Sequence, residues 1–357
     1  MPHPGVRRVA VTVLAEYEDR IDVRSPSEFA DDHVPSATNH PVLDNTERAR
    51  IGTLYASSPF AARKLGAAIV ARNIASMLET AFAERPREWQ PLVYCWRGGQ
   101  RSRALTQVLH EVGWRAVQLE GGYRAYRRHV VAELARVPQR FVVICGLTGS
   151  GKSRLLAALA ASGAQTLDLE TLARHRGSLL GDLPGEPQPS QKSFESQLLD
   201  ALARLDPSRP VYVESESRRI GSVQMPDALL AAMRVGRALT LRTPLEKRVA
   251  LLKAEYAHFL ADPALLGACL RPLTPLHGKA TIARWEAMAV AADWDPLIAE
   301  LLQAHYDPTY ARSLERNFPA APSSRVIEAH EIAPAAFAAL ALDVRALLEA
   351  DEPLESR

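Results

Sequence analysis

Short apolar runs alternate with longer segments of helical periodicity through the first third of the chain. Runs of strand length occupy residues 9–14, 20–23, 92–95 and 116–119. Apolar residues recur every three or four positions over 59–82 and 101–112, a spacing that predicts amphipathic helices. Alternating strands and helices are typical of a parallel sheet with helices on its faces. The pattern therefore predicts an α/β domain over residues 1–136.

A second alternation of the same kind begins after Pro138. Strand-like runs occupy 140–145, 166–169 and 211–214, and a helical segment spans 152–161. Residues 177–192 are rich in glycine, proline, serine and glutamine, which indicates a loop. After Thr243 and Pro244 the apolar spacing becomes helical. We expect a second α/β domain over 137–243 and a helical C-terminal region over 244–357, a candidate for contact with RNA.

The composition narrows the class of protein. Of the 357 residues 47% are apolar, and no apolar run reaches the roughly 20 residues that span a bilayer. Residues 1–10 lack the apolar core of a secretory leader. We therefore expect the chain to act in the cytoplasm without a membrane partner. The oligomeric state stays open.

Positive charge is concentrated in particular segments. The formal net charge is only +2, yet residues 84–140 contain eleven arginines and five glutamates. Residues 234–253 contain six lysines or arginines and one glutamate. Clustered arginine suits a phosphate-rich partner such as RNA, but solvated helix faces give the same pattern. Charge alone leaves both interpretations open.

The three cysteines form no spaced pairs, so the sequence indicates neither a disulfide framework nor a zinc site. Cys145 and Cys269 lie among apolar residues and are expected to serve packing. Cys95 instead ends a strand and precedes a glycine- and arginine-rich loop that enters a helix. Backbone N–H groups, the helix dipole and nearby guanidinium groups in such a loop favour a thiolate. We therefore predict that Cys95 is catalytic.

The loop around this cysteine forms a cradle for an oxyanion or for sulfur or selenium carried on the thiolate. Its members are Trp96, Arg97, Gly98, Gly99, Gln100, Arg101 and Ser102. Cys95 and Arg101 also satisfy the C-x5-R spacing of cysteine phosphatases, although Tyr94 stands where many of these have histidine. Segments 21–29 and 33–37 resemble the N-terminal signature of rhodanese sulfurtransferase domains, which favours sulfur or selenium transfer. For Trp96, stacking on a base and packing in the core both stay open.

A second loop matches the pattern G-x-x-x-x-G-K-[ST] in full, after a predicted strand and before a predicted helix. It consists of Gly146, Leu147, Thr148, Gly149, Ser150, Gly151, Lys152 and Ser153. Its backbone amides and the helix N-terminus bind phosphate oxygens, Lys152 reaches the outer phosphate, and the Ser153 hydroxyl can ligate magnesium. The sequence therefore predicts a phosphate site.

The acidic partner of this loop has two candidates. Asp168 and Glu214 each end a predicted strand, where a carboxylate can hold magnesium or its water ligand. A helix cap or a surface position explains each of them equally well. The metal stays unknown at this stage, and nothing in the spacing identifies a nucleotide.

With both loops in this order, the chain resembles the tRNA 2-selenouridine synthase family, in which a rhodanese domain is fused to a P-loop domain. The matching stretches are 22–26, 58–60, 63–66, 94–102, 121–123, 146–153, 168–170, 175–178 and 216–218. Asp32 and Ser36 stand where the pattern G-H-x-P-G-A of rhodanese domains has glycines. That departure changes the expected geometry of this loop more than it changes the resemblance to the family.

The resemblance implies replacement of sulfur by selenium in 2-thiouridine at the wobble position of the tRNA anticodon loop, with selenophosphate as donor. It also implies a geranylated thiouridine intermediate made from geranyl diphosphate. In that scheme the phosphate loop holds the diphosphate, and Lys152 stabilises the departing pyrophosphate. Cys95 either carries selenium or positions selenophosphate. Asp22 and Arg24 are structural by the same resemblance.

Two other functions remain alternatives at this stage. One is a cysteine phosphatase or arsenate-reductase-like domain fused to a small-molecule kinase. The other is a non-catalytic rhodanese-like module on an RNA-binding ATPase, for which Cys95 would be dispensable.

Overall fold

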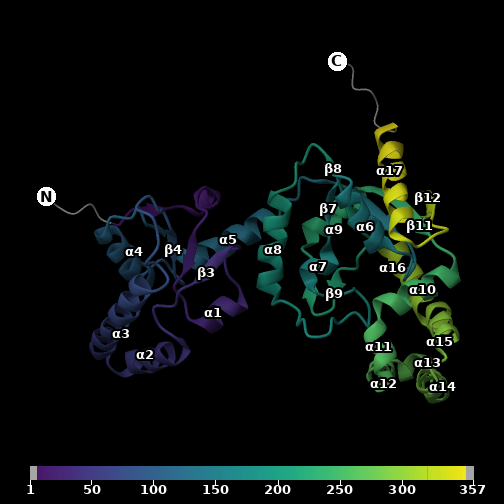
Figure 1. The fold of residues 1–357 in the computed structure, drawn as a ribbon, viewed down its shortest axis with the longest axis horizontal. Coiled ribbons are helices and arrows are strands. Elements are labelled where there is room, and N and C mark those ends of the chain that lie inside the picture. Colours follow the sequence, from purple (N-terminus) through teal and green to yellow (C-terminus); the bar gives the residue numbers. More distant parts are fainter. Residues whose placement is uncertain (1–5, 320, 351–357) are drawn as a thin grey trace. The chain divides into compact units, whose positions relative to one another are not determined.

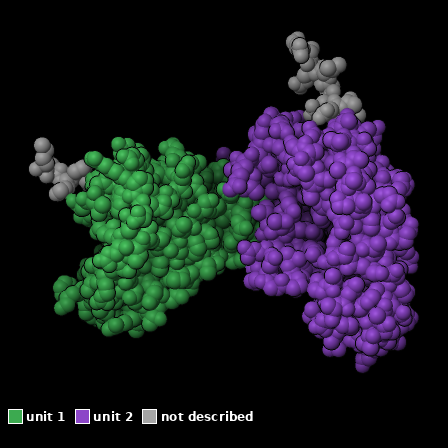
Figure 2. All heavy atoms as spheres, viewed as in Figure 1, with its two compact units in different colours: residues 1–134, 189–200 green, residues 135–188, 201–357 purple. Residues whose placement is uncertain are grey.

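The structure, a computed structural model, describes residues 6–319 and 321–350. Residues 1–5, the first half of the segment that lacks the pattern of a secretory leader, lie outside the described residues. The chain divides into two compact units (Figure 2). Unit 1 comprises residues 1–134 and 189–200, and unit 2 comprises 135–188 and 201–357.

Unit 1 is built on a five-stranded sheet of order β1-β5-β4-β2-β3, in which every neighbouring pair is parallel. Its strands are β1 (Arg8–Val9), β2 (Arg20–Asp22), β3 (Ala37–Asn39), β4 (Leu92–Tyr94) and β5 (Val117–Leu119). Its helices are η1 (Val11–Glu16), α1 (Pro26–Asp31), α2 (Asn45–Ser57), α3 (Pro59–Glu79), α4 (Gln100–Val112), α5 (Gly122–Leu134) and most of α8 (Gln191–Ala203).

The strand expected over 9–14 is wrong for most of its length. Only β1 pairs with β5, and Val11–Glu16 form the 3-10 helix η1, in which no residue is buried. β1 is the edge strand of the sheet, so it pairs with β5 alone. That pairing covers only Arg8 and Val9. The apolar side chains of η1 therefore cover the rim of unit 1 and do not enter its centre.

Unit 2 contains a second five-stranded parallel sheet of order β12-β11-β6-β8-β7. Its strands are β6 (Arg140–Cys145), β7 (Gln165–Leu167), β8 (Pro210–Glu214), β11 (Arg237–Arg242) and β12 (Arg325–Glu328), and β9 (Arg219–Ile220) pairs with β10 (Val223–Gln224) in a separate hairpin. Helices α6 (Lys152–Ala161), α7 (Leu169–Ala173), α9 (Asp227–Val235) and α17 (Pro334–Ala350) accompany the sheet. β6 is central, and the loop after it enters α6.

A run of helices connects β11 to β12 and packs around its own core (Figure 1). It consists of α10 (Leu245–Glu255), α11 (Ala257–Ala261), α12 (Pro263–Leu270), η2 (Arg271–Leu273), α13 (Thr274–His277), α14 (Lys279–Val290), α15 (Trp294–Leu301), η3 (Leu302–Tyr306), α16 (Asp307–Asn317) and η4 (Ala321–Ser323). Trp285 is fully buried at its centre. We call residues 245–317 the helical insert.

The C-terminal region is helical as expected, but the helical character expected just after the interruption near 319–322 is wrong at one segment. Arg325–Glu328 add an edge strand to the sheet, and only Ile327 of these four is buried, so the run is too short and too exposed to show a strand pattern. α17 then packs against α6, with Phe337 in the shared core. Within the described residues, none of the helices combines the length and the apolarity that crossing a bilayer requires.

Candidate functional site

The first candidate site is the loop that follows β4 in unit 1. Cys95 comes directly after the strand and is 3% exposed. Its Sγ accepts hydrogen bonds from the backbone N–H of Gly99 at 3.3 Å and from the hydroxyl of Ser102 at 3.1 Å. The loop therefore holds the cysteine sulfur between two hydrogen-bond donors.

Gln118 of β5 holds this loop in shape. The buried side chain donates from Nε2 to the carbonyls of Gly98 and Gly99, at 3.0 and 3.1 Å, and to the Ser102 hydroxyl at 2.7 Å. The loop also passes very close to Gly122, where a Cβ would lie 2.2 Å from the Cys95 carbonyl oxygen. Gln118 belongs to no local motif, so its role becomes visible only when β5 lies beside β4.

The charged and aromatic members of the loop have different surroundings. Arg101 pairs with Glu28, with Nη1 2.7 Å from Oε2, so its charge is partly offset. Arg97 is exposed, and so is Gln100 at the start of α4. Trp96 is half-buried, and its ring lies 5.2 Å from that of Tyr123 at a tilt of 33°. The structure thus leaves Arg97 facing solvent beside Cys95.

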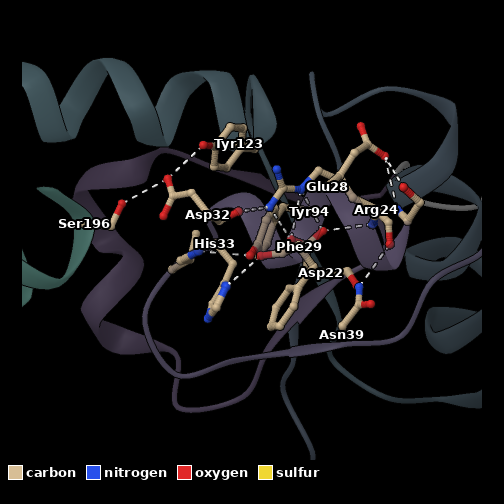
Figure 3. A network of polar contacts seen from close by, with 12 residues as sticks. Asp22, Arg24, Glu28, Phe29, Asp32, His33, Asn39, Tyr94, Tyr123 and Ser196 are labelled. Atoms are coloured by element: carbon tan, nitrogen blue, oxygen red, sulfur yellow. Dashed lines mark hydrogen bonds and ion pairs between the residues drawn. The ribbon is translucent and has the colours of Figure 1, made fainter. Parts of the chain in front are cut away.

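Tyr123 connects the cysteine loop to a buried carboxylate (Figure 3). Its backbone N–H donates to the Cys95 carbonyl at 2.8 Å, and its hydroxyl donates to Asp32 at 2.8 Å. Ser196 of α8 donates to the same carboxylate at 3.1 Å. Burial raises the pKa of Asp32 even though Tyr123, Ser196 and Arg127 counteract it. Asp32, which occupies a glycine position of the rhodanese pattern, therefore anchors segment 189–200 within unit 1.

Asp22 and Arg24 form a buried ion pair beneath this loop. Arg24 is 1% exposed, and its guanidinium donates to both carboxylate oxygens of Asp22 and to the backbone carbonyl of Asp32 (Figure 3). The same guanidinium lies 3.9 Å above the centre of the Tyr123 ring. The pair thus joins β2 to the segment that carries Tyr123.

Replacing Arg24 with alanine is expected to lower the stability of unit 1 by about 3–5 kcal/mol, because Asp22 would keep a buried charge without its partner. Urea unfolding of the full chain, with hydrogen exchange of β2 and β4 as the local readout, measures the loss. Arg72→Ala, on the exposed face of α3, is the matched control and should change stability by less than about 0.5 kcal/mol. Equal stability of the two variants would contradict the structural role of this pair.

The second candidate site is the phosphate loop between β6 and α6 in unit 2, residues 146–153. Lys152 bends over the loop and donates from Nζ to the Gly146 carbonyl at 3.0 Å. Its ammonium group lies 5.0 Å from the centre of the Tyr310 ring. Burial would lower the pKa of Lys152, but Tyr310 and three nearby glutamates outweigh it, so the net shift is upward. Lys152 is therefore a cation at neutral pH.

Side chains from the helical insert and its approach fix the rest of the loop. Buried Arg248 of α10 donates from Nε to the Thr148 carbonyl at 2.9 Å and pairs with Asp307 of α16. Thr243 donates to the Ser150 carbonyl at 2.8 Å. Leu147 is exposed at the tip of the loop. Arg248 is a positioning residue that no motif in the sequence identifies.

Three carboxylates gather beside Lys152. Glu170, Glu214 and Glu216 each offer an oxygen, and these oxygens all lie within 4.8 Å of one another. Burial raises the pKa of all three, and Lys152 opposes that rise. Repulsion from Glu216 raises the pKa of Glu170 and Glu214 further. Glu214 is 3% exposed, and its Oε1 is buried without a hydrogen-bond partner. Oxygens arranged in this way fit a divalent cation such as Mg²⁺.

The two acidic candidates from the sequence occupy different places. Glu214 belongs to the carboxylate cluster, and Ser153 lies near its edge, with its hydroxyl 3.5 Å from Glu170. Asp168 caps α7, accepting from the backbone N–H of Thr171 at 2.8 Å and from its hydroxyl at 2.7 Å. The sequence assigned no role to Glu170 or Glu216, although both lie in stretches that carried the family resemblance.

The segment 175–178 closes the cluster from the opposite side. Gly177 has φ +66°, and a Cβ there would lie 2.6 Å from Oε2 of Glu216, so only glycine fits without displacing the carboxylate. Arg176 donates to the Glu255 carbonyl at 2.6 Å and stacks over Tyr256. A cavity of about 760 Å³ contains the phosphate loop, the three carboxylates and Arg176. A larger cavity of about 880 Å³ surrounds the beginnings of β6, β8 and β11, away from this chemistry.

Both halves of the chain match known families. Residues 13–129 match the family described as Rhodanese-like domain, and residues 139–266 match that described as tRNA 2-selenouridine synthase AAA domain. A rhodanese-related protein from Thermoplasma volcanium aligns with a TM-score of 0.23 at 20% identity, covering 34% of this chain and 92% of that one.

Full-length relatives extend the match. A tRNA 2-selenouridine synthase from Bdellovibrio bacteriovorus is 33% identical over 340 residues, covering 83% of this chain and 89% of its own length. A tRNA 2-selenouridine synthase from Nitrosomonas europaea is 36% identical over 262 residues, which cover 70% of this chain. That second alignment spans 66% of the relative's length, just under two thirds.

Proposed function

Since the chain belongs to the tRNA 2-selenouridine synthase family, we propose that it replaces the sulfur of 2-thiouridine in the anticodon loop of tRNA with selenium. Selenophosphate is the selenium donor, and an S-geranylated base made from geranyl diphosphate is the intermediate. The enzyme is then a transferase in both steps and works in the cytoplasm. One observation carries the proposal: the same chain holds a cysteine sulfur facing two donors and a phosphate loop whose lysine faces three carboxylates.

Alkylation is assigned to unit 2. The sulfur of the thiouridine attacks C1 of geranyl diphosphate, the C1–O bond breaks, and pyrophosphate leaves with the electron pair. The base loses its N3 proton to solvent. Charge grows on the departing oxygen, so fixed donors and cations around it lower the barrier. The amides of the phosphate loop bind the diphosphate, Lys152 faces the leaving oxygen, and Arg176 supplies a second cation in the same cavity.

Exchange of sulfur for selenium is assigned to unit 1. The selenium of selenophosphate attacks C2 of the geranylated base and forms a C2–Se bond. The C2–S bond breaks, and geranylthiolate leaves with the electron pair and takes a proton from solvent to become geranylthiol. A geranylthiolate is a better leaving group than a ring sulfide. Water then takes the phosphoryl group from selenium as inorganic phosphate. Cys95 serves this step by positioning selenophosphate, or it carries selenium on its sulfur; the second role needs an external two-electron oxidant to form the S–Se bond and a thiol reductant to break it, because selenophosphate holds selenium at the selenide level. The cradle of N–H and O–H donors at Gly99 and Ser102 supports both roles.

The tRNA contact is assigned in part to arginines around the cysteine loop. Arg97 is exposed beside Cys95, and exposed Arg124 follows Tyr123, with its backbone N–H 3.1 Å from the Trp96 carbonyl. Guanidinium groups at such positions bind backbone phosphates, while an anticodon loop offers unstacked bases to the site. Trp96 offers an aromatic face for one of these bases.

Magnesium is part of the proposal for the phosphate loop. Glu214, Glu170 and Glu216 would hold Mg²⁺ together with the Ser153 hydroxyl, and the ion would offset the charge of the diphosphate. The orphaned Oε1 of Glu214 is the observation that supports this assignment.

Glu214→Gln is expected to raise the Mg²⁺ concentration for half-maximal geranyl transfer by about tenfold or more, because it removes a charged ligand from the cluster. Asp168→Asn is the matched control, since asparagine still caps α7 and the same charge is lost nearby. That control should shift the Mg²⁺ requirement by less than about twofold. If Asp168→Asn raised the Mg²⁺ requirement more than Glu214→Gln does, the role of magnesium ligand would belong to Asp168.

Reconstitution with purified components tests the whole proposal. The protein receives thiolated tRNA with geranyl diphosphate, with selenophosphate and with both, and nucleoside mass spectrometry identifies each product. We expect S-geranyl-2-thiouridine when geranyl diphosphate is supplied alone, and 2-selenouridine when geranyl diphosphate and selenophosphate are supplied together. Hydrolysis of an aryl phosphate without any selenium entering tRNA would support a phosphatase instead.

A further inference from the structure

A narrow apolar cavity lies inside the helical insert of unit 2. Its volume is about 60 Å³, and it is bounded by α10, α11, α12, α15, η3 and the segment 178–180. Its apolar lining residues are Leu180, Leu252, Phe259, Leu260, Leu266, Trp294, Leu297, Ile298, Leu301 and Leu302. Among the residues that the structure describes, no acidic or basic side chain lines it. We call it the apolar chamber.

The chamber adjoins the phosphate cavity. Five residues line both: Thr148, Ser178, Leu252, Tyr256 and Tyr306. Thr148 belongs to the phosphate loop itself, so the mouth of the chamber lies at the loop that receives the phosphates. The hydroxyl groups of the chamber, on one threonine, one serine and two tyrosines, all belong to this shared mouth.

We propose that the apolar chamber binds the hydrocarbon chain of the diphosphate ester, while the phosphate loop binds its diphosphate. This inference rests on the proposed function, which supplies the diphosphate donor. It adds the place where the donor's hydrocarbon chain binds and the side chains that select that chain. Charge on one side of Thr148 and apolar side chains on the other match a molecule with an anionic head and an aliphatic tail.

The lining also argues against a nucleotide. A nucleobase carries ring nitrogens and exocyclic groups that need hydrogen-bond partners when buried. Beyond the mouth, the only polar side-chain atom among the described chamber residues is the indole nitrogen of Trp294.

Ile298 and Leu301 of α15 provide the test of chain recognition. Ile298 is only half-buried, so a larger side chain there narrows the chamber with limited strain on the fold, and Leu301→Ala lengthens it. The probes are inorganic pyrophosphate, dimethylallyl diphosphate, geranyl diphosphate, farnesyl diphosphate and ATP, each bound to the full chain with Mg²⁺ and measured by calorimetry. Val290→Trp, on an exposed position of α14, is the matched control.

We expect the unmodified protein to bind geranyl diphosphate at least about tenfold more tightly than pyrophosphate. Ile298→Trp should lower the affinity for geranyl diphosphate to that for pyrophosphate, and should change the affinity for pyrophosphate itself by less than about twofold. Leu301→Ala should shift the binding preference towards farnesyl diphosphate. Val290→Trp should bind every probe as the unmodified protein does.

Three results would overturn the inference or its premise. If Ile298→Trp still binds pyrophosphate and keeps the original affinity for geranyl diphosphate, the chain lies elsewhere, although the proposed function stands. If Ile298→Trp fails to fold, the test rests on Leu301→Ala. A Leu301→Ala protein that binds the probes in the same order of affinity as the unmodified protein would reject the chamber as the site of the hydrocarbon chain. If the unmodified protein binds ATP more tightly than any prenyl diphosphate, the proposed function fails as well.

Discussion

Replacing Cys95 with alanine is expected to stop the formation of selenouridine while geranylated thiouridine continues to form and accumulates. The Gly99 and Ser102 donors hold the sulfur of Cys95, and loss of a side chain on which the chemical step depends lowers the rate by about 10³-fold or more. Alkylation survives because the phosphate loop belongs to unit 2, which has its own core. Nucleoside mass spectrometry of the same tRNA sample measures both products.

Cys95→Ser distinguishes the two roles left open for this residue. If the sulfur carries selenium, serine is as inactive as alanine, because a hydroxyl forms no comparable bond to selenium. If the side chain only positions selenophosphate, serine keeps a measurable part of the rate. Cys269→Ala, in the helical insert, is the control and should form selenouridine normally. A normal selenouridine level in Cys95→Ala would refute the assignment of the first site.

Lys152→Ala is expected to lower geranyl transfer by about 10²- to 10³-fold, because the departing pyrophosphate loses the cation that faces it. The loss also leaves Glu170, Glu214 and Glu216 without the charge that opposes their repulsion. The variant should therefore bind pyrophosphate poorly even when Mg²⁺ is abundant. Formation of S-geranyl-2-thiouridine over time measures the effect.

A rescue experiment confines this defect to the first step. Lys152→Ala supplied with tRNA that already carries the geranyl group should produce selenouridine at the rate of the unmodified protein. Lys247→Ala, a lysine of α10 that pairs with Glu331, is the control and should retain geranyl transfer. Failure of the rescue would mean that Lys152 also serves the exchange of selenium, and the division of labour between the units would be wrong.

The sequence predicts the two loops well because each is a local arrangement. The strand, the loop and the helix are consecutive at Leu92–Tyr94 with Gln100–Val112 and at Arg140–Cys145 with Lys152–Ala161, so apolar spacing and glycine positions are enough to place them. The residues that hold the loops come from distant segments. Gln118 and Arg248 reach them only through the pairing of β5 with β4 and the packing of α10, which no local pattern encodes.

The carboxylate cluster shows the same limit from another direction. Glu170 follows β7, Glu214 ends β8 and Glu216 follows it; the pairing of these two strands makes them neighbours. Sequence spacing offered Asp168 and Glu214 equally, because a cap and a metal ligand use the same carboxylate group. The strand expected over 9–14 and the helical expectation for Arg325–Glu328 were wrong at sheet edges, where a strand has one partner and little buried surface.

The helical insert occupies the crossover between two adjacent parallel strands, since β11 ends at Arg242 and β12 begins at Arg325. The two strands that flank this crossover pair directly with each other in the sheet that carries the phosphate loop. Phe337 of α17, which follows the crossover, packs against Gly151 of that loop. Substitutions at crossover positions that line the apolar chamber but not the phosphate cavity, such as Ile298, can therefore accumulate while Arg248 and Tyr310 of the same crossover keep the diphosphate site in place. Evolution can retune which tail a homologue accepts while leaving its pyrophosphate chemistry intact.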